Sequence, residues 1–138
     1  MREIGTIKQV QIQTGKLKIG TRPESHYDPK HILVVERLLL TLEGAIGVTK
    51  DAEKIVDCHN ARHPETRNNG TNPITIGFTT HYATMREQYG AHLTDGIAGE
   101  NIIITAEHSF VWDDLVKGIA FKNADGTLHQ FRMLKVAE

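Results

Sequence analysis

The chain has 138 residues, a length that suits one domain with a buried core. Hydrophobic residues make up 39% of it and charged residues 24%, and the formal net charge is -1. This balance is typical of a globular protein and gives no basis for bulk attraction to nucleic acid or to an anionic membrane. The single cysteine excludes an internal disulfide, so we expect a reducing, cytoplasmic location.

The organisation along the chain predicts one domain. The N-terminus lacks the apolar stretch of a signal peptide, and no apolar run approaches the length of a membrane span. No internal repeat, low-complexity tract or Pro/Ser-rich linker interrupts the sequence. We therefore expect a single domain over residues 1–138, with no membrane partner and no nucleic-acid partner.

The first forty residues favour strands. Residues 4–12 alternate with a period of two, which predicts an opening strand, and Gly15 begins a hairpin into residues 16–19. Residues 21–30 have the composition of a loop. Residues 31–42 fit two structures, because 32–35 favour a strand and 36–40 would suit a helix.

The middle of the chain contains the clearest helix. A short helical turn is predicted near residues 52–56, before a polar loop, and Pro73 precedes a short buried strand at 74–76. The helix is predicted over residues 79–89, with Thr79 or Thr80 as its cap and Gly90 as its end. Its apolar stripe should face the core and consists of Phe78, Tyr82, Met85 and Tyr89.

The C-terminal third predicts a hairpin. Residues 116–122 and 127–136 flank the turn sequence NADG at 123–126. The chain as a whole then has many strands and one good helix. We expect a mainly β fold with minor α content, in the form of a closed or nearly closed barrel.

Residues 93–105 carry the most informative motif, LTDGIAGENIIIT. Two glycine-bearing turns present Glu100 and Asn101 side by side, and the β-branched run 102–104 continues as a buried strand. An acid and an amide at the mouth of a strand form a polar anchor. We expect both side chains to be at least half buried, with Arg62 or Arg67 as a partner of Glu100 and with Asn101 holding a neighbouring loop.

This segment resembles the G-E-N motif of MOSC domains, the family named after the C-terminal domain of molybdenum cofactor sulfurase. The order of elements is also similar to the MOSC pattern over about residues 1–135. A glycine-rich strand exit at 43–48 precedes a loop with His63 and Asn69-Gly70, an aromatic helix at 78–86 and then the motif. The resemblance favours a strand at 31–42 and implies a small MOSC-like β-barrel with one packed helix.

The resemblance also implies a ligand. It points to a molybdopterin-type molybdenum cofactor or another small anionic, sulfur-containing ligand; full-length relatives include sulfur-transferring and amidoxime- or hydroxylamine-reducing proteins. MOSC domains usually carry a reactive cysteine shortly after the last hairpin, whereas residues 134–138 contain none. We therefore expect ligand binding without the family's cysteine-based sulfur transfer, assign no catalytic residue and leave open whether the chain is an enzyme.

The polar loop at 57–70 is the candidate ligand site. Arg62 and Arg67 offer forked donors for phosphate or carboxylate, and Asn69 with the following glycine amide would complete an anion cradle. A solvated surface loop explains the same composition equally well. The predicted ligand-binding residues are Arg62, His63, Arg67, Asn69, Glu100 and Asn101.

Cys58 and His59 allow two further interpretations. A neighbouring imidazolium would activate the thiol, but side chains adjacent on an extended segment point apart, so an incidental cysteine is favoured. Cys58, His59 and His63 would also begin a zinc site with the distant His81, which we otherwise place on the surface. Their spacing matches no paired-ligand pattern, so we expect no metal.

Two hypotheses for the chain's role stay open. In the first, it is a binding module for a small anionic ligand. In the second, it is a homo-oligomeric interaction module: a MOSC-like barrel that ends at Glu138 lacks its usual final segment, and an uncovered strand edge would pair with a second copy.

Overall fold

Strands dominate the structure, as the sequence predicts. The computed structural model describes residues 2–15, 17–21, 23–64, 66 and 73–132. The chain divides into two compact units, residues 1–107 and 108–138. The described strands belong to four separate open sheets, so the closed barrel and the single domain both stay predictions.

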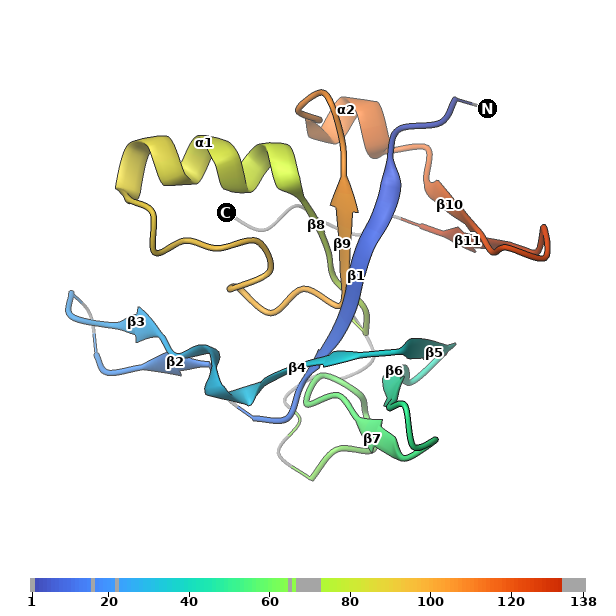
Figure 1. Cartoon of the computed structure of the whole chain (residues 1–138), viewed down its shortest axis with the longest axis horizontal. Helices are drawn as coiled ribbons and strands as arrows, with labels where there is room; N and C mark the ends of the chain where they lie inside the picture. Colours follow the sequence, from blue (N-terminus) through green and yellow to red (C-terminus); the bar gives the residue numbers. More distant parts are fainter. Residues whose placement is uncertain (1, 16, 22, 65, 67–72, 133–138) are drawn as a thin grey trace. The chain divides into compact units, whose positions relative to one another are not determined.

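The largest sheet of the first unit has the strand order β4-β1-β9-β8. Its members are β1 (Thr6–Gln13), β4 (Ile32–Val35), β8 (Ile76–Phe78) and β9 (Ile102–Thr105). β1 is antiparallel to both β4 and β9, and β8 is parallel to β9. Figure 1 shows β1 and β9 side by side along this sheet.

β9 is buried on both faces. Ile102, Ile103 and Ile104 are each 3% exposed or less. A β-branched run suits a strand with neighbours on both sides, because its branched side chains pack well on the pleated surface. The strand predicted after the G-E-N motif is therefore confirmed, and its position in the sheet places Asn101 at its first end.

A second sheet is an antiparallel meander. It consists of β5 (Arg37–Thr41), β6 (Gly44–Val48) and β7 (Lys54–Val56). β4 and β5 confirm the strand interpretation of residues 31–42. The two sheets approach closely at Gly47, where an added Cβ would lie 2.8 Å from Val35 Cγ1 and 3.1 Å from Ile12 Cγ2. Only a glycine lets these two layers of core meet there.

The helical turn predicted at 52–56 is wrong. Residues 49–53 form the turn between β6 and β7, in which Ala52 adopts a φ of 61°. The backbone amide of Glu53 donates to Thr49 Oγ1, and the amide of Thr49 donates to the carbonyl of Glu53. Pairing of β7 with β6 outweighs the local helix preference, which has only one turn in which to act.

The hairpin predicted from Gly15 is also wrong in its partner. β2 (Lys18–Ile19) pairs with β3 (His26–Tyr27) inside the segment predicted as loop. A 3-10 turn at Pro29–His31 then leads into β4. The two sides of β1 pair instead with β4 and β9. Each of these pairings is longer than the one between β2 and β3 and so forms more backbone hydrogen bonds.

The predicted helix is α1 (Thr79–Tyr89), and it connects β8 to β9. Gly90 ends it with a φ of 118°. The predicted threonine cap is wrong, because Thr79 Oγ1 instead accepts a hydrogen bond from the backbone of Ala106. The apolar stripe is correct at Phe78 and Tyr82 but wrong at Tyr89, which is 69% exposed at the last turn.

The second unit holds a short helix and the predicted C-terminal hairpin. These elements are α2 (Trp112–Leu115), β10 (Ile119–Lys122) and β11 (Leu128–Phe131). The rings of Phe121 and Phe131 pack edge to face across the hairpin at 5.3 Å between centroids. Residues 133–136 of the predicted last strand lie outside the described residues.

None of the helices in the described part of the chain is long and apolar enough to cross a membrane.

Candidate functional site

The structure joins two segments that are more than forty residues apart in sequence. One is the loop after β7, which contains Asp57, Cys58 and His59. The other is the G-E-N motif that leads into β9. They meet beside Gln13 at the end of β1, where the buried side chains of Asp57 and Asn101 are hydrogen-bonded to each other and the backbone amide of Gln13 donates to Asp57.

The carboxylate of Asp57 is the centre of this network and is fully buried. Its Oδ2 accepts from the backbone amide of Gln13 at 2.7 Å and from the side-chain Nδ2 of Asn101 at 3.0 Å. Its Oδ1 accepts from the His59 amide at 2.8 Å and faces His59 Nδ1 at 3.2 Å. Four donors match the lone-pair capacity of a carboxylate, so its burial is fully compensated.

The charges on Asp57 and His59 stabilise one another. Burial opposes the ionised carboxylate, but hydrogen bonds from the His59 side chain and from the Gln13 and His59 backbone keep the pKa of Asp57 below its usual value. The hydrogen bond to Asp57, and then that to Cys58, raises the pKa of His59 to about 10. His59 is therefore an imidazolium at neutral pH, with a side chain that is 42% exposed.

The Cys58 side chain points to the same place as its neighbours. The Asn60 amide donates to the Asp57 carbonyl at 2.9 Å and closes a turn, so these adjacent side chains do not alternate as they would on a strand. Cys58 Sγ lies 3.6 Å from His59 Nδ1 and 3.5 Å from Gln13 Oε1. Cys58 and His59 are therefore in contact, although neighbouring side chains on an extended segment would point apart.

This trio does not form a nucleophilic relay. In a relay one ring nitrogen faces the nucleophile and the other faces the carboxylate. Here Nδ1 of His59 faces both Cys58 Sγ and Asp57 Oδ1. A protonated ring cannot act as the general base for the thiol.

Asn60 and the Arg62 backbone complete the loop. Asn60 is fully buried, and its Nδ2 donates to the Ala45 carbonyl at 3.2 Å while its Oδ1 accepts from the Arg62 amide at 2.9 Å. Among the described residues, every fully buried side-chain nitrogen and oxygen has a hydrogen-bond partner. The first half of the loop is thus fixed by its interior side chains.

Asn101 performs the role predicted for it. It is 1% exposed, its Oδ1 accepts from the Thr75 amide at 3.2 Å, and its Nδ2 also donates to the Gln11 carbonyl at 3.2 Å. With the bond to Asp57 it ties together β1, the segment before β8 and the loop after β7. These three bonds need one acceptor and two donors, which a side-chain amide provides.

Glu100 is anchored by Tyr82 and not by Arg62, while the other predicted partner, Arg67, lies outside the described residues. It is partly buried, and Tyr82 Oη donates to its Oε2 at 2.5 Å. Tyr82 Oη also accepts from the Ala98 amide at 3.1 Å. Arg62 instead forms an ion pair with Glu43, and both side chains of that pair are exposed.

Glutamines of β1 fix the turns of the motif. Gln11 Nε2 donates to the Gly96 carbonyl at 2.8 Å, and Gln13 Nε2 donates to the Gly99 carbonyl at 3.3 Å. Gly99 has a φ of 87° and lies against the Gln13 amide, so a side chain there would be strained and would collide. The motif's backbone is therefore set from β1.

Asp95 links the first of these turns to α1. Its carboxylate accepts from Lys8 Nζ at 2.7 Å and from Arg86 Nη1 at 2.8 Å. Burial opposes ionisation, but these two cations outweigh it and lower the pKa of Asp95. Arg86 also donates to the Leu93 carbonyl at 3.0 Å and so holds the chain that follows the helix.

The predicted ligand-binding residues separate into three groups. Glu100 and Asn101 are bonded inside the fold, and Asn101 has almost no exposed surface for a ligand. Arg62 and His63 lie on the loop, where Arg62 is exposed and His63 partly buried. Arg67 and Asn69 lie outside the described residues.

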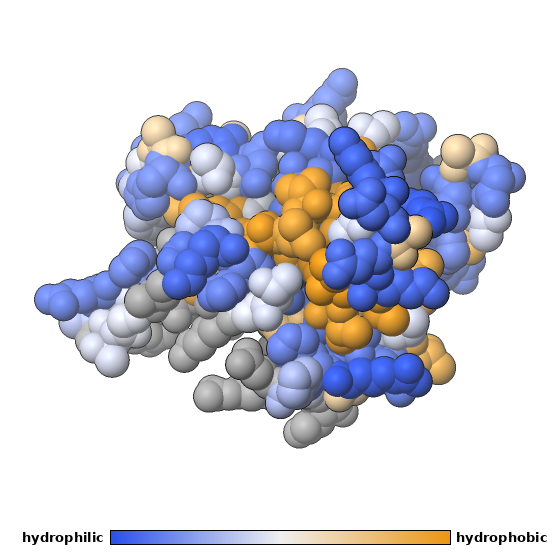
Figure 2. All heavy atoms as spheres, turned by 60° about the horizontal axis from the view of Figure 1, so that its bottom comes forward, coloured by the Kyte–Doolittle hydropathy of each residue, from blue (hydrophilic) through white to orange (hydrophobic). Residues whose placement is uncertain are grey.

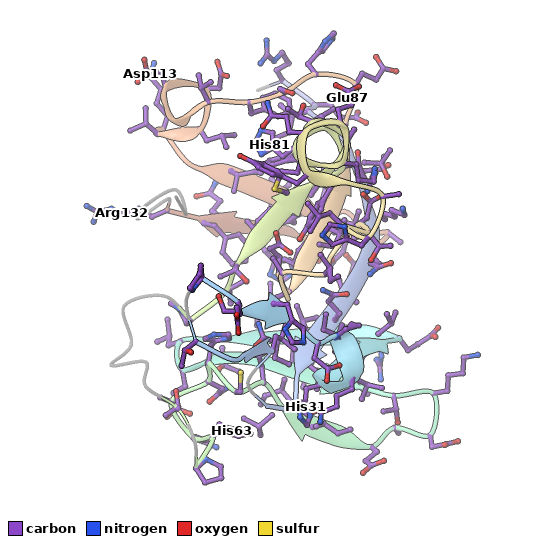
Figure 3. The ribbon with its side chains drawn as sticks, turned by 90° about the vertical axis from the view of Figure 1, so that its left-hand side faces the viewer. His31, His63, His81, Glu87, Asp113 and Arg132 are labelled. Carbon is purple, nitrogen blue, oxygen red and sulfur yellow. The ribbon has the colours of Figure 1, made fainter. Side chains whose placement is uncertain are left out.

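His63 and His81 do not converge. Figure 3 shows His63 on the loop after β7 and His81 on α1, well separated in the view. His81 is partly buried, and its ring packs edge to face with Phe78 at 5.5 Å, so it is neither fully exposed nor part of the buried core. The zinc hypothesis that joined these two histidines has no support in this geometry.

Sequence reasoning missed Asp57 and Gln13. Asp57 carried a local signal, since an aspartate in a polar loop is typical of an Asx-turn, in which its carboxylate accepts from the backbone amide two residues later. Gln13 and Gln11 carried none, because the motif carbonyls to which their side chains donate lie 85 or more residues away along the chain. Long-range polar contacts of this kind have no local pattern.

Comparisons with protein-family models, with curated proteins and with solved structures find no match to this chain.

Proposed function

We propose that this chain is a MOSC-like binding domain for a molybdopterin-type cofactor or another small anionic, sulfur-containing ligand. The ligand site is the exposed face of the loop formed by residues 57–63, which we call the His59 loop. In this proposal the sheets of the chain are parts of a β-barrel of the MOSC type. The domain binds its ligand without cysteine-based sulfur transfer.

One observation carries the proposal. The amide of Asn101, the last residue of the G-E-N motif, donates to the carboxylate of Asp57, and that carboxylate holds His59 as a cation. The residues behind the family resemblance therefore support a fixed positive charge on a loop. Such a charge, already oriented before binding, favours an anion because little ordering is needed when the ligand arrives.

Two cationic side chains are exposed on the His59 loop. The His59 imidazolium is 42% exposed and the Arg62 side chain is 71% exposed. The Arg62 pair with Glu43 is a surface ion pair of small stability, so a phosphate competes with it readily. A guanidinium and an imidazolium are both groups that donate charge-assisted hydrogen bonds to a phosphate such as that of a pterin cofactor.

We propose no sulfur transfer because of the position of the cysteine. MOSC domains usually carry their reactive cysteine shortly after the last hairpin, whereas Cys58 lies in the loop after β7. We expect Cys58→Ser to bind the anionic ligand as tightly as the natural chain.

The experiment measures pterin retained by protein purified from cells that make molybdopterin. Native mass spectrometry gives the stoichiometry, and the fluorescence of the oxidised pterin released by acid identifies the ligand. We expect close to one pterin per chain. His59→Gln should lower binding on the order of tenfold or more, because a hydrogen bond to a charged group contributes about 1.5–3 kcal/mol.

Matched controls separate the site from bulk charge. Arg62→Ala should lower retention, whereas Arg37→Ala, which removes an exposed arginine from β5, should not. Failure of the natural chain to retain pterin, together with no binding of inorganic phosphate or sulfate in calorimetry, would overturn the proposal.

A homo-oligomeric module is the second candidate, and the outer strand β4 favours it. In the described residues β4 pairs on one side only, with β1, and its Val34 is 59% exposed. In the view of Figure 2, hydrophobic residues lie in the middle of the visible face of the molecule. Unpaired strand edges invite pairing with a second copy.

Light scattering tests this candidate directly. A homodimer should dissociate in Val34→Lys, because a charge on an outer strand opposes edge-to-edge pairing. Leu42→Lys is the matched control, since Leu42 is 98% exposed in the turn between β5 and β6. A monomer for the natural chain at micromolar concentration would exclude the module.

A further inference from the structure

The turn at Asp57, Cys58 and His59 brings three metal-binding atoms to one point. A carboxylate oxygen of Asp57, Cys58 Sγ and a ring nitrogen of His59 lie within 4.8 Å of one another. Consecutive side chains share a side here because the Asn60 amide closes the turn onto the Asp57 carbonyl. A carboxylate oxygen, a thiolate and an imidazole are all ordinary ligands of zinc.

Two of the three distances match a tetrahedral cation. With zinc bonds of about 2.3 Å to sulfur and about 2.0–2.1 Å to nitrogen or oxygen, tetrahedral angles separate sulfur from nitrogen by about 3.6 Å and nitrogen from oxygen by about 3.3 Å. The observed separations are 3.6 Å between Cys58 Sγ and His59 Nδ1, and 3.2 Å between His59 Nδ1 and Asp57 Oδ1.

The carboxylate is already oriented from behind. Asp57 Oδ2 is held by the Gln13 amide and by Asn101 Nδ2, while Oδ1 faces the other two metal-binding atoms. Hydrogen bonds that fix a ligand in this way raise metal affinity and set its geometry. The polar network around Asp57 therefore supplies the outer support that a metal site needs.

We propose that Asp57, Cys58 and His59 bind one zinc-type divalent cation. The three protein atoms leave a fourth position, which a water molecule or an anionic ligand occupies. Ionised Asp57 and Cys58 together balance the two positive charges. The proposal goes beyond anion binding, because it requires only the cation and these three residues.

Binding exchanges protons for the metal. The cation takes the place of the proton between His59 Nδ1 and Asp57 Oδ1, and it binds Cys58 as the thiolate, so two protons leave. The backbone amide of His59 keeps its bond to Asp57 Oδ1, and both bonds to Oδ2 remain. The loop therefore needs no refolding to accept the ion.

The experiment titrates the metal-free chain with Co²⁺ and then displaces it with Zn²⁺. A tetrahedral cobalt–thiolate site absorbs in the near ultraviolet by charge transfer from sulfur, and this band reports Cys58 alone because the chain has one cysteine. We expect one cobalt per chain and loss of the band in Cys58→Ser. The affinity for Zn²⁺ should fall at least on the order of tenfold in that variant and in His59→Gln.

His63→Gln is the matched control, because His63 lies on the same loop but outside the three-atom cluster. It should keep the band and the affinity. A natural chain without a charge-transfer band, or a Cys58→Ser variant that binds Zn²⁺ as tightly as the natural chain, would overturn the proposal.

Alkylation gives a readout that needs no variant. Zn²⁺ should slow modification of Cys58 in the folded natural chain by at least on the order of tenfold, since a bound thiolate is not free to react. Equal rates with and without the metal contradict the site. Pterin retention is expected to survive Cys58→Ser while metal binding is not, so failure of one proposal is distinguishable from failure of the other.

Discussion

The two ends of the His59 loop differ in what their polar side chains do. At the first end Asp57 and Asn60 are fully buried, and each has at least one hydrogen bond to another segment of the fold. At the other end Arg62 is 71% exposed and pairs with a glutamate on the surface. Buried polar groups fix the shape of this loop, and exposed ones carry its charge.

This difference reflects the cost of desolvation. A buried carboxylate without partners would be strongly unfavourable, so its four donors must all be in place before the loop is stable. A surface ion pair has water as an alternative partner and contributes little. Substitutions at the first end should therefore affect folding, whereas substitutions at the second should affect binding alone.

The largest expected effect is at Asp57. Asp57→Ala removes the acceptor of four hydrogen bonds. It leaves the backbone amide of Gln13 and one of the two N–H groups of Asn101 Nδ2 without their acceptor in the interior. We expect a loss of about 3–5 kcal/mol in the free energy of unfolding, measured with urea. Asp51→Ala, in an exposed turn, is the control and should change it by less than about 0.5 kcal/mol. Equal stability of the two variants would contradict the comparison.

Asn101→Ala should have the next largest effect. It leaves the Thr75 amide and one lone pair of Asp57 without their partner. We expect a destabilisation of about 1–3 kcal/mol in urea unfolding. Because the lost bond also orients Asp57, Asn101→Ala and Asp57→Ala should be less than additive, and strict additivity would show that the motif and the loop are not coupled.

Glu100 and Tyr82 offer a test on the other side of the motif. Glu100→Ala leaves the Tyr82 hydroxyl without its acceptor, at a cost of about 1–3 kcal/mol. In the Tyr82→Phe background the same substitution should cost less, because the donor is already absent. A double-mutant cycle by thermal unfolding measures this coupling, and a zero coupling energy would remove the anchor role of Glu100.

His59 should make stability depend on pH in the alkaline range. Its pKa rises from 6.5 in the unfolded chain to about 10 in the fold, so the folded state binds the proton more tightly. The resulting stabilisation is complete below pH 6.5 and is lost as the pH rises through about 10. Asp57 acts in the opposite range, since its lowered pKa gives stability above 3.8 that is lost in acid.

The pH dependence is measured by urea unfolding from neutral to alkaline pH. The natural chain should lose more stability over that range than His59→Gln, which has no proton to release at this position. Parallel curves for the two proteins would contradict an imidazolium held by Asp57.

Arg62→Ala should have the smallest effect on folding. The pair with Glu43 is exposed on both sides, so its removal should change the free energy of unfolding by about 0–1 kcal/mol. Binding of the anionic ligand should weaken in the same variant. A large loss of stability would show that the second end of the loop is structural as well.

Much of the local structure was predictable from sequence because its causes are local. The β-branched run at 102–104 and the helix that ends at Gly90 were both predicted correctly. The helical turn predicted at residues 52–56 was wrong, because pairing with a neighbouring strand outweighs the helix preference of so short a segment. The prediction that Tyr89 is buried was wrong, because an apolar stripe shows which face of a helix is buried and cannot show at which residue along the helix the core ends.

The candidate site was predictable only in part. The G-E-N motif marked Asn101 as an anchor, since an amide at a strand mouth needs partners, and the structure supplies them. The predicted arginine partner of Glu100 was wrong at Arg62, because that side chain extends to Glu43 on the surface. The partner found, Tyr82, had been assigned only to the core.

The sequence by itself determined the mainly β character, the position of α1 and the polar anchor before β9, because periodicity and turn chemistry act over a few residues. Only the tertiary structure decided that Asn101 supports Asp57 and that Asp57 in turn charges His59 beside Cys58. The contact between Asn101 and Asp57 joins segments 44 residues apart, and its hydrogen bond forms because burial leaves both groups no water to bond.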